Sequence, residues 1–166
     1  MAGRADWPGG IGGRRIDARE IEIAVLENIK SVSEPLTSTV GEIKPTHEFY
    51  SYESKYLDEN GAELYIPAKM DQAQMKEAQQ IASKVFVALE CQGMARVDLF
   101  LDRKSGEFYL NEINTIPGFT QISMYPKLWE ASGLAYAELL DKLIELALER
   151  GKMKKKLLRE FSGAKG

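Results

Sequence analysis

Apolar and polar residues alternate along two neighbouring segments in the second half of the chain, residues 94–102 and 107–114. Alternation with a period of two is typical of a half-buried β-strand. The four residues between the segments, Arg103 to Gly106, have a turn-like composition. The pattern therefore predicts an antiparallel hairpin, and most of the candidate chemistry of the chain lies on it.

The alternation assigns one set of side chains to a common face of each predicted strand: Arg96, Asp98 and Phe100 on the first, and Leu110, Glu112 and Asn114 on the second. A pairing of Asp102 with Phe108 would place Asp98 directly opposite Glu112. The same pairing would place Arg96 opposite Asn114. Charged groups of both signs would then share one surface of the hairpin.

Two carboxylates that face each other across an antiparallel pair repel, so such a pair needs a nearby cation or exposure to water. Asp98, Glu112 and Asn114 all offer oxygen donors, which suit Mg²⁺ or Mn²⁺ better than zinc. Mg²⁺ commonly takes one or two carboxylates and fills its other positions with phosphate and water. The spacing alone is also compatible with ordinary solvated side chains on a half-buried hairpin.

The rest of the chain predicts one further strand and two helices. Residues 16–27 alternate with Ile21, Ile23 and Val25 on one face, the pattern of a strand with one face toward a core. Apolar residues recur every three or four positions in residues 71–90 and 134–150, which predicts amphipathic helices. Asp71 and Gln74 form a candidate capping pair at the start of the first helix. We expect Gly151 to end the second.

The segments between these elements are expected to be loops. Residues 31–39 have the composition of a surface loop, and residues 47–67 combine five aromatic residues with several charges, which favours an ordered functional loop over a linker. Residues 126–129 begin an amphipathic stretch in which Trp129 is expected to be buried. Helices that follow strands, together with an antiparallel hairpin, indicate an α+β layer structure.

Both ends of the chain differ from the middle. Residues 1–15 are rich in Gly and Arg without apolar periodicity and predict a loose arm, either disordered or a cloning remnant. Residues 151–166 form a basic tail, for which a solvated terminal helix is favoured over binding to RNA or a membrane surface. The folded portion is therefore expected to span residues 16–150.

Composition narrows the functional classes. A length of 166 residues fits one domain, and a net charge of −3 provides no basic field for nucleic acid. The single cysteine, Cys91, excludes an intrachain disulfide and is expected to be a packing residue, while the single histidine, His47, leaves no His/Cys cluster for zinc. We find no apolar run long enough to span a membrane and no signal peptide, so a cytoplasmic protein is expected.

The stretch ARVD…NEINTIPGFTQISMYPKLWEASG resembles the carboxyl-terminal part of the D-alanine:D-alanine ligases, which are members of the ATP-grasp superfamily. The similarity extends over residues 16–150. It implies the C-terminal portion of an ATP-grasp fold, with a mostly antiparallel sheet packed against helices and the remainder of the fold missing. It also implies ATP- and Mg²⁺-dependent joining of two D-alanines through an acyl phosphate, for peptidoglycan synthesis.

The resemblance implies roles for four residues near the reacting atoms. Arg96 and the backbone after the turn at Gly118 would hold the oxyanion of the tetrahedral intermediate. Lys55 would reach the γ-phosphate, and Tyr56 would face the second D-alanine. These residue types suit the task, because a fixed guanidinium matches developing negative charge and a glycine lets the backbone approach a ligand.

The remaining implied residues bind nucleotide, substrate and metal. Glu20 would hold the ribose hydroxyls of ATP, with Lys55 and Asn111 as further nucleotide contacts. Ser123 and Met124 would seat the second substrate. The resemblance also implies that the Asp98, Glu112 and Asn114 set clamps the metal ions.

A member of the resembling family is about twice as long as this chain, and the absent half would bind the first D-alanine. The chain alone is therefore expected to be weakly active or inactive, and a complementing amino-terminal half or a homodimer is a possible partner. Two alternatives remain open. One is a non-catalytic nucleotide-binding or interaction fragment; the other is a ligase with D-serine or D-lactate as acceptor, although Tyr56 speaks against D-lactate.

Overall fold

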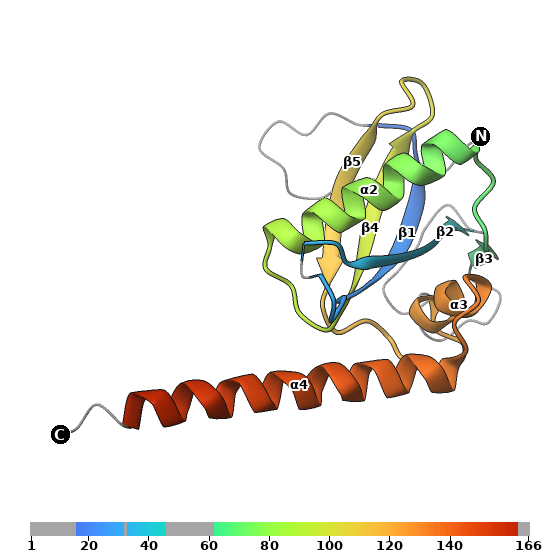
Figure 1. Cartoon of the computed structure of the whole chain (residues 1–166). Helices are drawn as coiled ribbons and strands as arrows, with labels where there is room; N and C mark the ends of the chain where they lie inside the picture. Colours follow the sequence, from blue (N-terminus) through green and yellow to red (C-terminus); the bar gives the residue numbers. More distant parts are fainter. Residues whose placement is uncertain (1–15, 32, 46–61, 163–166) are drawn as a thin grey trace.

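The computed structural model describes residues 16–31, 33–45 and 62–162, and it shows an antiparallel sheet with helices on both faces (Figure 1). The five strands lie in the order β3-β2-β1-β4-β5. In chain order the elements are β1 (Ala18–Leu26), β2 (Leu36–Pro45), β3 (Ala62–Tyr65), α2 (Gln72–Ala88), β4 (Met94–Asp102), β5 (Phe108–Asn114), α3 (Met124–Ala131) and α4 (Tyr136–Ser162). The expected α+β class with a mostly antiparallel sheet is confirmed.

The first core layer lies between the sheet and α2. Ile21, Ile23 and Val25 of β1 point into it together with alternate residues of β4, and Ala78, Ala82 and Phe86 of α2 cover them. The predicted cap at the start of this helix is confirmed, since Asp71 accepts a hydrogen bond of 2.8 Å from the backbone N–H of Gln74.

The second core layer covers part of the opposite face. Ala24 and Leu26 of β1 pack there against Tyr125, Leu128 and Trp129 of α3, and against the first turns of α4. Trp129 is buried, as expected. The prediction that β1 turns only one face to a core is therefore wrong, because α3 and α4 cover part of the second face. The remainder of that face carries the polar residues of the candidate site.

The hairpin of β4 and β5 forms where it was predicted, but with a bulge. Asp98 pairs with Glu112 and Arg96 pairs with Asn114, as expected. Beyond Asp98 the register shifts by one residue, so that Phe108 pairs with Leu101 and the predicted pairing of Phe108 with Asp102 is wrong. The shift is produced by one extra residue in β5, a β-bulge.

The bulge changes which side chains share a face. Leu110 pairs with Leu99, which belongs to the core beneath α2. Leu110 therefore lies on the α2 face, and its predicted position beside Glu112 and Asn114 is wrong. Asn111, between the two registers, has no cross-strand partner in the ladder with β4.

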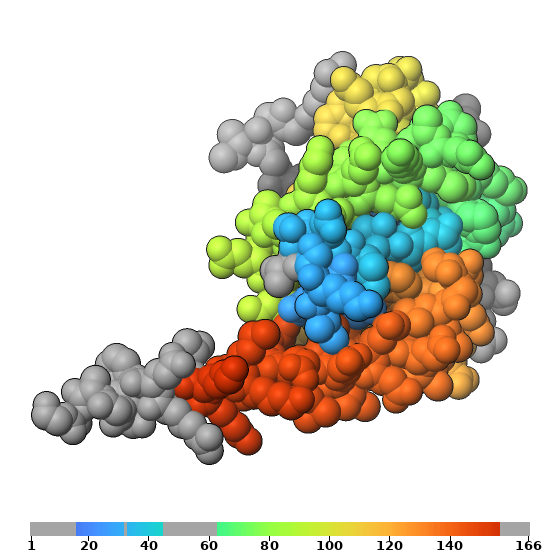
Figure 2. Space-filling view, viewed as in Figure 1, coloured from blue at the N-terminus to red at the C-terminus, as the bar shows by residue number. Residues whose placement is uncertain are grey.

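Two further expectations fail at the ends of elements. The segment expected to be a surface loop ends at residue 35, because β2 begins at Leu36. Helix α4 continues through Gly151 to Ser162, and its last turns extend past the sheet (Figure 1); the coloured part of the helix lies along the lower edge of the molecule in Figure 2. A glycine inside a helix costs only about 1 kcal/mol. The helix-forming residues that follow Gly151 outweigh this cost, so the expected helix end is wrong.

Among the described residues, no helix is sufficiently long and apolar to cross a membrane. The predicted arm, residues 1–15, and most of the expected functional loop lie outside the described residues.

Candidate active site

Three carboxylates form a row across the sheet on the face opposite α2. Glu22 of β1 pairs with Asp98 of β4, which in turn pairs with Glu112 of β5. Directly paired residues on neighbouring strands project from the same face, with Cβ atoms about 5 Å apart. Glu22 and Asp98 are buried, at 0% and 1% exposure, while Glu112 is exposed. The row therefore runs from the interior of the sheet to its edge.

Arg96 lies beside this row on the same face of the sheet, two residues before Asp98 on β4, where it pairs with Asn114 of β5. Its Nε donates to Oδ1 of Asp98 at 2.8 Å, and its Nη2 donates to Oδ2 at 2.7 Å. The same Nε lies 3.2 Å from Oε2 of Glu22. A two-point contact between guanidinium and carboxylate fixes the orientation of both groups. Arg96 is thus held in place before any ligand arrives.

The electrostatics of Arg96 show how strongly the acids dominate its surroundings. Burial by itself would lower the pKa of the guanidinium. The hydrogen bond to Asp98 and the charges of Glu22, Asp98 and Glu112 act in the opposite direction, and the net result is a pKa raised above its ordinary value. Arg96 is therefore a permanent cation in this site.

One guanidinium does not balance three carboxylates. With all four groups ionised, three negative charges and one positive charge leave a net charge of −2 on this part of the sheet. Such a surface favours a divalent cation, and its oxygen donors suit Mg²⁺ or Mn²⁺. Both carboxylate oxygens of Asp98 accept hydrogen bonds from Arg96. Asp98 therefore has to give up at least one of these bonds in order to bind a cation.

No preassembled cage of three or more His, Cys, Asp or Glu ligands exists within the described part of the chain. A hard cation that keeps several water or phosphate ligands does not need such a cage. Asp98 and Glu112 are adjacent, and Asn114 lies further along β5. The Oδ1 of Asn114 accepts a hydrogen bond of 3.1 Å from the backbone N–H of Ile116, which starts the turn after the strand. These residues fit a weak, partly solvated cation site.

The loop after β5 folds tightly around Ser123. The backbone N–H of Thr120 donates to Ser123 Oγ at 3.1 Å, and the N–H of Ser123 donates to the carbonyl of Thr120 at 2.9 Å. A Cβ at Gly118 would lie 3.0 Å from Ser123 Oγ, which is tighter than almost all real contacts. A larger residue at this position would have to displace the Ser123 side chain by a few tenths of an ångström, and the exposed backbone at Gly118 remains open to a ligand.

The other expected site residues lie in different surroundings. Glu20 lies two residues from Glu22 on β1, so its side chain projects from the same face. Asn111 is at the bulge of β5. Met124 is buried in the second core layer beside Gly41, and Ser123 is the residue that precedes α3. Lys55 and Tyr56 lie outside the described residues.

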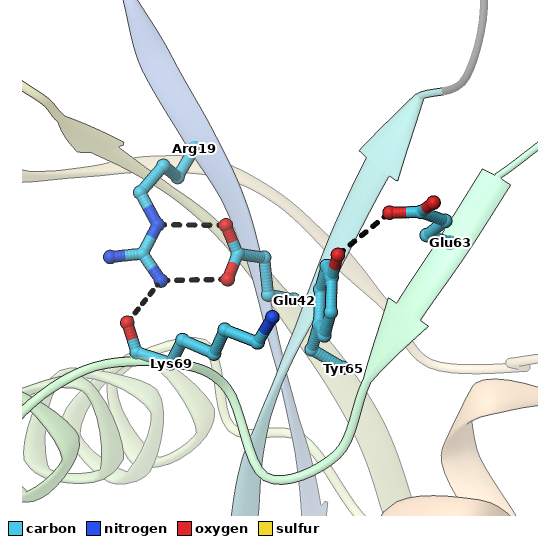
Figure 3. A network of polar contacts seen from close by, with 5 residues as sticks. All are labelled: Arg19, Glu42, Glu63, Tyr65 and Lys69. Carbon is cyan, nitrogen blue, oxygen red and sulfur yellow. Dashed lines mark hydrogen bonds and ion pairs between the residues drawn. The ribbon is translucent and has the colours of Figure 1, made fainter.

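A second arginine–carboxylate cluster lies on the opposite face of the sheet (Figure 3). Arg19 Nε and Nη2 donate to the two carboxylate oxygens of Glu42 at 2.8 and 2.7 Å, and Nη2 also donates to the carbonyl of Lys69. One positive and one negative charge here balance each other. This cluster joins β1, β2 and the start of the segment leading to α2.

Sequence comparison adds the family to this geometry. The family described as "D-ala D-ala ligase C-terminus" matches residues 13–145. The chain belongs to this family. The matched residues include β1, β4 and β5, and thus the carboxylate row, Arg96 and the loop at Gly118.

Individual proteins that are similar to this chain support the same family. The chain is 56% identical over 149 residues to the D-alanine--D-alanine ligase A of Bradyrhizobium diazoefficiens, covering 89% of this chain and 39% of the relative. It is 56% identical over 142 residues to the D-alanine--D-alanine ligase of Oceanobacillus iheyensis, covering 86% of this chain and 37% of the relative. The chain therefore spans about two fifths of the length of these relatives.

Solved structures confirm the fold of the ligase C-terminus. The D-alanine-D-alanine ligase from Coxiella burnetii matches with a TM-score of 0.73 at 44% identity, over 90% of this chain and 37% of that protein. The VanG D-Ala:D-Ser ligase from Enterococcus faecalis matches with a TM-score of 0.66 at 39% identity, over 79% of this chain and 36% of that protein. The expected ATP-grasp-like arrangement of the C-terminal portion is thereby confirmed.

Sequence reasoning missed Glu22. The predicted strand of residues 16–27, with Ile21, Ile23 and Val25 toward a core, leaves Glu22 on the opposite, solvent face, although its side chain is fully buried beside Arg96. The sequence did contain a signal that this face is also covered: Ala24 and Leu26, which share the face with Glu22, are apolar.

Proposed function

We propose that this chain supplies the metal-binding and oxyanion-binding part of a D-alanine:D-alanine ligase. The reaction joins two D-alanines through an acyl phosphate at the expense of ATP, in the cytoplasm, for peptidoglycan synthesis. The observation that carries the proposal is the geometry of Arg96: one fixed guanidinium beside an acidic row with excess negative charge.

The geometry supports two different tasks on one face. The described contacts of Arg96 use Nε and Nη2, which leaves Nη1 for an anionic group of the reacting substrate. Asp98, Glu112 and Asn114 would hold Mg²⁺, which supplies neutralisation of the negative charge on the transferring phosphate. A fixed cation lowers the barrier when it interacts more strongly with charge that appears during the reaction than with the ground state.

The other assigned residues follow the same proposal. Glu20 and Asn111 would contact the nucleotide, and the backbone at Gly118 would join Arg96 at the oxyanion. Ser123 would contact the second D-alanine directly; the buried Met124 would shape that subsite from below. Lys55 would reach the γ-phosphate, and Tyr56 would face the second D-alanine. We infer D-alanine as the acceptor because the two relatives with 56% identity are named D-alanine--D-alanine ligases.

The chain covers about two fifths of its relatives, so the proposed reaction needs the rest of the enzyme. The test is to mix this chain with the amino-terminal part of the Bradyrhizobium relative, covering the region before the match. ADP release and D-alanyl-D-alanine formation are then measured with ATP, Mg²⁺ and D-alanine. We expect D-alanine-dependent turnover only when both polypeptides are present.

Two matched arginine variants sharpen this experiment. Arg96→Ala should abolish dipeptide formation while ATP binding is retained, because the guanidinium acts on charge that develops during the reaction. Arg19→Ala removes an arginine from the opposite face and should retain turnover after correction for the folded fraction. Absence of turnover with a well-folded partner would contradict the proposal and favour a non-catalytic fragment.

A further inference from the structure

Glu22 has no role in the function proposed above, yet the sheet buries its carboxylate completely. It lies in the centre of the sheet on β1, paired with Asp98 on one side and with Gly41 on the other. Burying an ionised carboxylate is costly unless a cation compensates it. The cation provided is Arg96, whose Nε lies 3.2 Å from Oε2 of Glu22.

The arrangement of Asp98 creates a conflict at the proposed cation site. Both of its oxygens accept hydrogen bonds from Arg96, at 2.8 and 2.7 Å. A cation bound to Asp98 has to take over at least one of these oxygens. Arg96 would then lose part of its compensation while its side chain stays only 15% exposed. A buried guanidinium that loses its carboxylate is a large penalty.

We propose that Glu22 is the positioning residue that retains Arg96 when Asp98 turns toward a divalent cation. The same Nε that donates to Asp98 already lies within ion-pair distance of Glu22. A small rotation of the guanidinium exchanges one carboxylate for the other without moving the arginine out of the site. Glu22 therefore makes the oxygens of Asp98 available and keeps Arg96 fixed for the substrate.

This inference rests on the proposed cation site, and its test separates the two ideas. The probe is Mn²⁺ alone, titrated into the full chain and followed by the electron paramagnetic resonance of free Mn²⁺. The variants are Glu22→Gln, which removes the charge, and Glu22→Asp, which retains the charge but shortens the side chain by one methylene. Glu112→Gln reports on the cation site itself.

We expect Glu22→Gln and Glu22→Asp each to weaken Mn²⁺ binding about tenfold, the usual scale for the loss of a residue that supports a metal ligand. The two variants should behave alike because neither can hold Arg96 at Nε. A simple attraction between the charge of Glu22 and Mn²⁺ predicts a different result, in which Glu22→Asp binds Mn²⁺ as the parent chain does. That result would overturn the inference.

The Nε–H resonance of Arg96 gives an independent readout of the exchange. In the parent chain, diamagnetic Mg²⁺ should shift this resonance while the proton stays protected from solvent. In Glu22→Gln, Mg²⁺ at a saturating concentration should leave the proton exchanging with water faster than in the parent chain, since the Glu22 carboxylate no longer receives it. Equal protection in both proteins would overturn the inference.

A matched control lies on the other face of the sheet. Glu42 is also a buried strand glutamate that pairs with an arginine, Arg19, and Glu42→Gln should leave Mn²⁺ affinity unchanged. If Glu112→Gln weakens Mn²⁺ binding and neither Glu22 variant does, the cation site stands and the role of Glu22 is wrong. If the parent chain binds no Mn²⁺, the proposed cation site is wrong and the inference falls with it. Circular dichroism of each variant confirms that it is folded.

Discussion

The two faces of the sheet use arginine in opposite ways. Beneath α2, the contacts of Arg19 with other described residues are the two-point pair with Glu42 and a hydrogen bond to the backbone carbonyl of Lys69. On the other face, Arg96 serves Glu22 and Asp98 together and feels the charge of Glu112 as well. Both guanidinium groups make a two-point contact with one carboxylate, so the geometry of a single ion pair does not distinguish them.

The difference lies in the balance of charge. The pair of Arg19 with Glu42 balances one positive charge against one negative charge, which suits a structural tie between β1, β2 and the segment before α2. The Arg96 cluster retains negative charge after its arginine is counted. Two buried carboxylates beside one arginine either lower the stability of the protein or provide the place for a further cation, and the proposed function rests on the second explanation.

The two faces should differ most in how much the free energy of unfolding falls when the arginine of each face is replaced. Arg96→Met should lower the free energy of unfolding by about 3–5 kcal/mol, because it strands two buried carboxylates. Arg19→Met should cost about 1–3 kcal/mol, because it strands one. Methionine retains most of the apolar stem in both cases. Urea unfolding followed by circular dichroism measures both values, and an equal or reversed order would contradict the comparison.

Neutralising a glutamate should reverse that order. Glu42→Gln leaves Arg19 without its carboxylate and should cost about 1.5–3 kcal/mol. Glu22→Gln leaves Arg96 with both contacts to Asp98 and also removes a repulsion between two paired acids. Its cost should be smaller, under about 1 kcal/mol. A larger loss for Glu22→Gln would show that the Arg96 cluster is a structural tie like the other one.

Mn²⁺ should stabilise the folded chain only by binding at the row of Glu22, Asp98 and Glu112. At ten times its dissociation constant a ligand adds about 1.4 kcal/mol to the free energy of unfolding. For a chain of this size that corresponds to a rise in melting temperature of about 3–6 °C. We expect this rise in the parent chain and in Glu42→Gln, corrected for its lower starting stability. The rise should be absent in Glu112→Gln, and its persistence there would place the cation elsewhere.

The smallest effect concerns the exposed edge of the Arg19 cluster. The hydrogen bond from Tyr65 to Glu63 (Figure 3), together with the neighbouring Lys44, lowers the pKa of the Glu63 carboxyl. A lowered folded-state pKa contributes stability above the unfolded value, which is lost as the pH falls through the folded value. Tyr65→Phe should therefore raise the pKa of Glu63 toward its ordinary value. Carbon-13 NMR titration of the Glu63 carboxyl measures this shift, and an unchanged pKa would show that Lys44 and Lys69 cause it without Tyr65.

Sequence periodicity predicted the elements that are regular along their whole length. The hairpin, the helix after Asp71 and the facing pairs Asp98–Glu112 and Arg96–Asn114 follow from periods of two and 3.6. The bulge at Asn111 left no signal in that pattern, because an extra residue in one strand is defined only by its partner strand. The face predicted for Leu110 was therefore wrong, although the predicted pairing of Asp98 with Glu112 was confirmed.

Burial that depends on distant elements was harder to predict. Glu22 looked like a solvated charge because nothing nearby in the sequence indicates that α3 and α4 cover the second face of β1, or that Arg96 lies beside it. Gly151 looked like a helix end because its local preference was considered without the helix-forming residues that follow. Both errors come from judging one residue by its immediate neighbours.

The most direct test of the account is to locate the cation on the sheet. Paramagnetic Mn²⁺ is added at a low ratio to the nitrogen-15-labelled chain, and the loss of intensity of each backbone amide is measured by NMR. We predict that broadening centres on residues 96–98 and 112–114 and includes Glu22, while the amides of Arg19 and Glu42 are affected least. Broadening centred on the Arg19 face, or uniform weak broadening over all exposed acids, would contradict the claim that the Arg96 face is the active site.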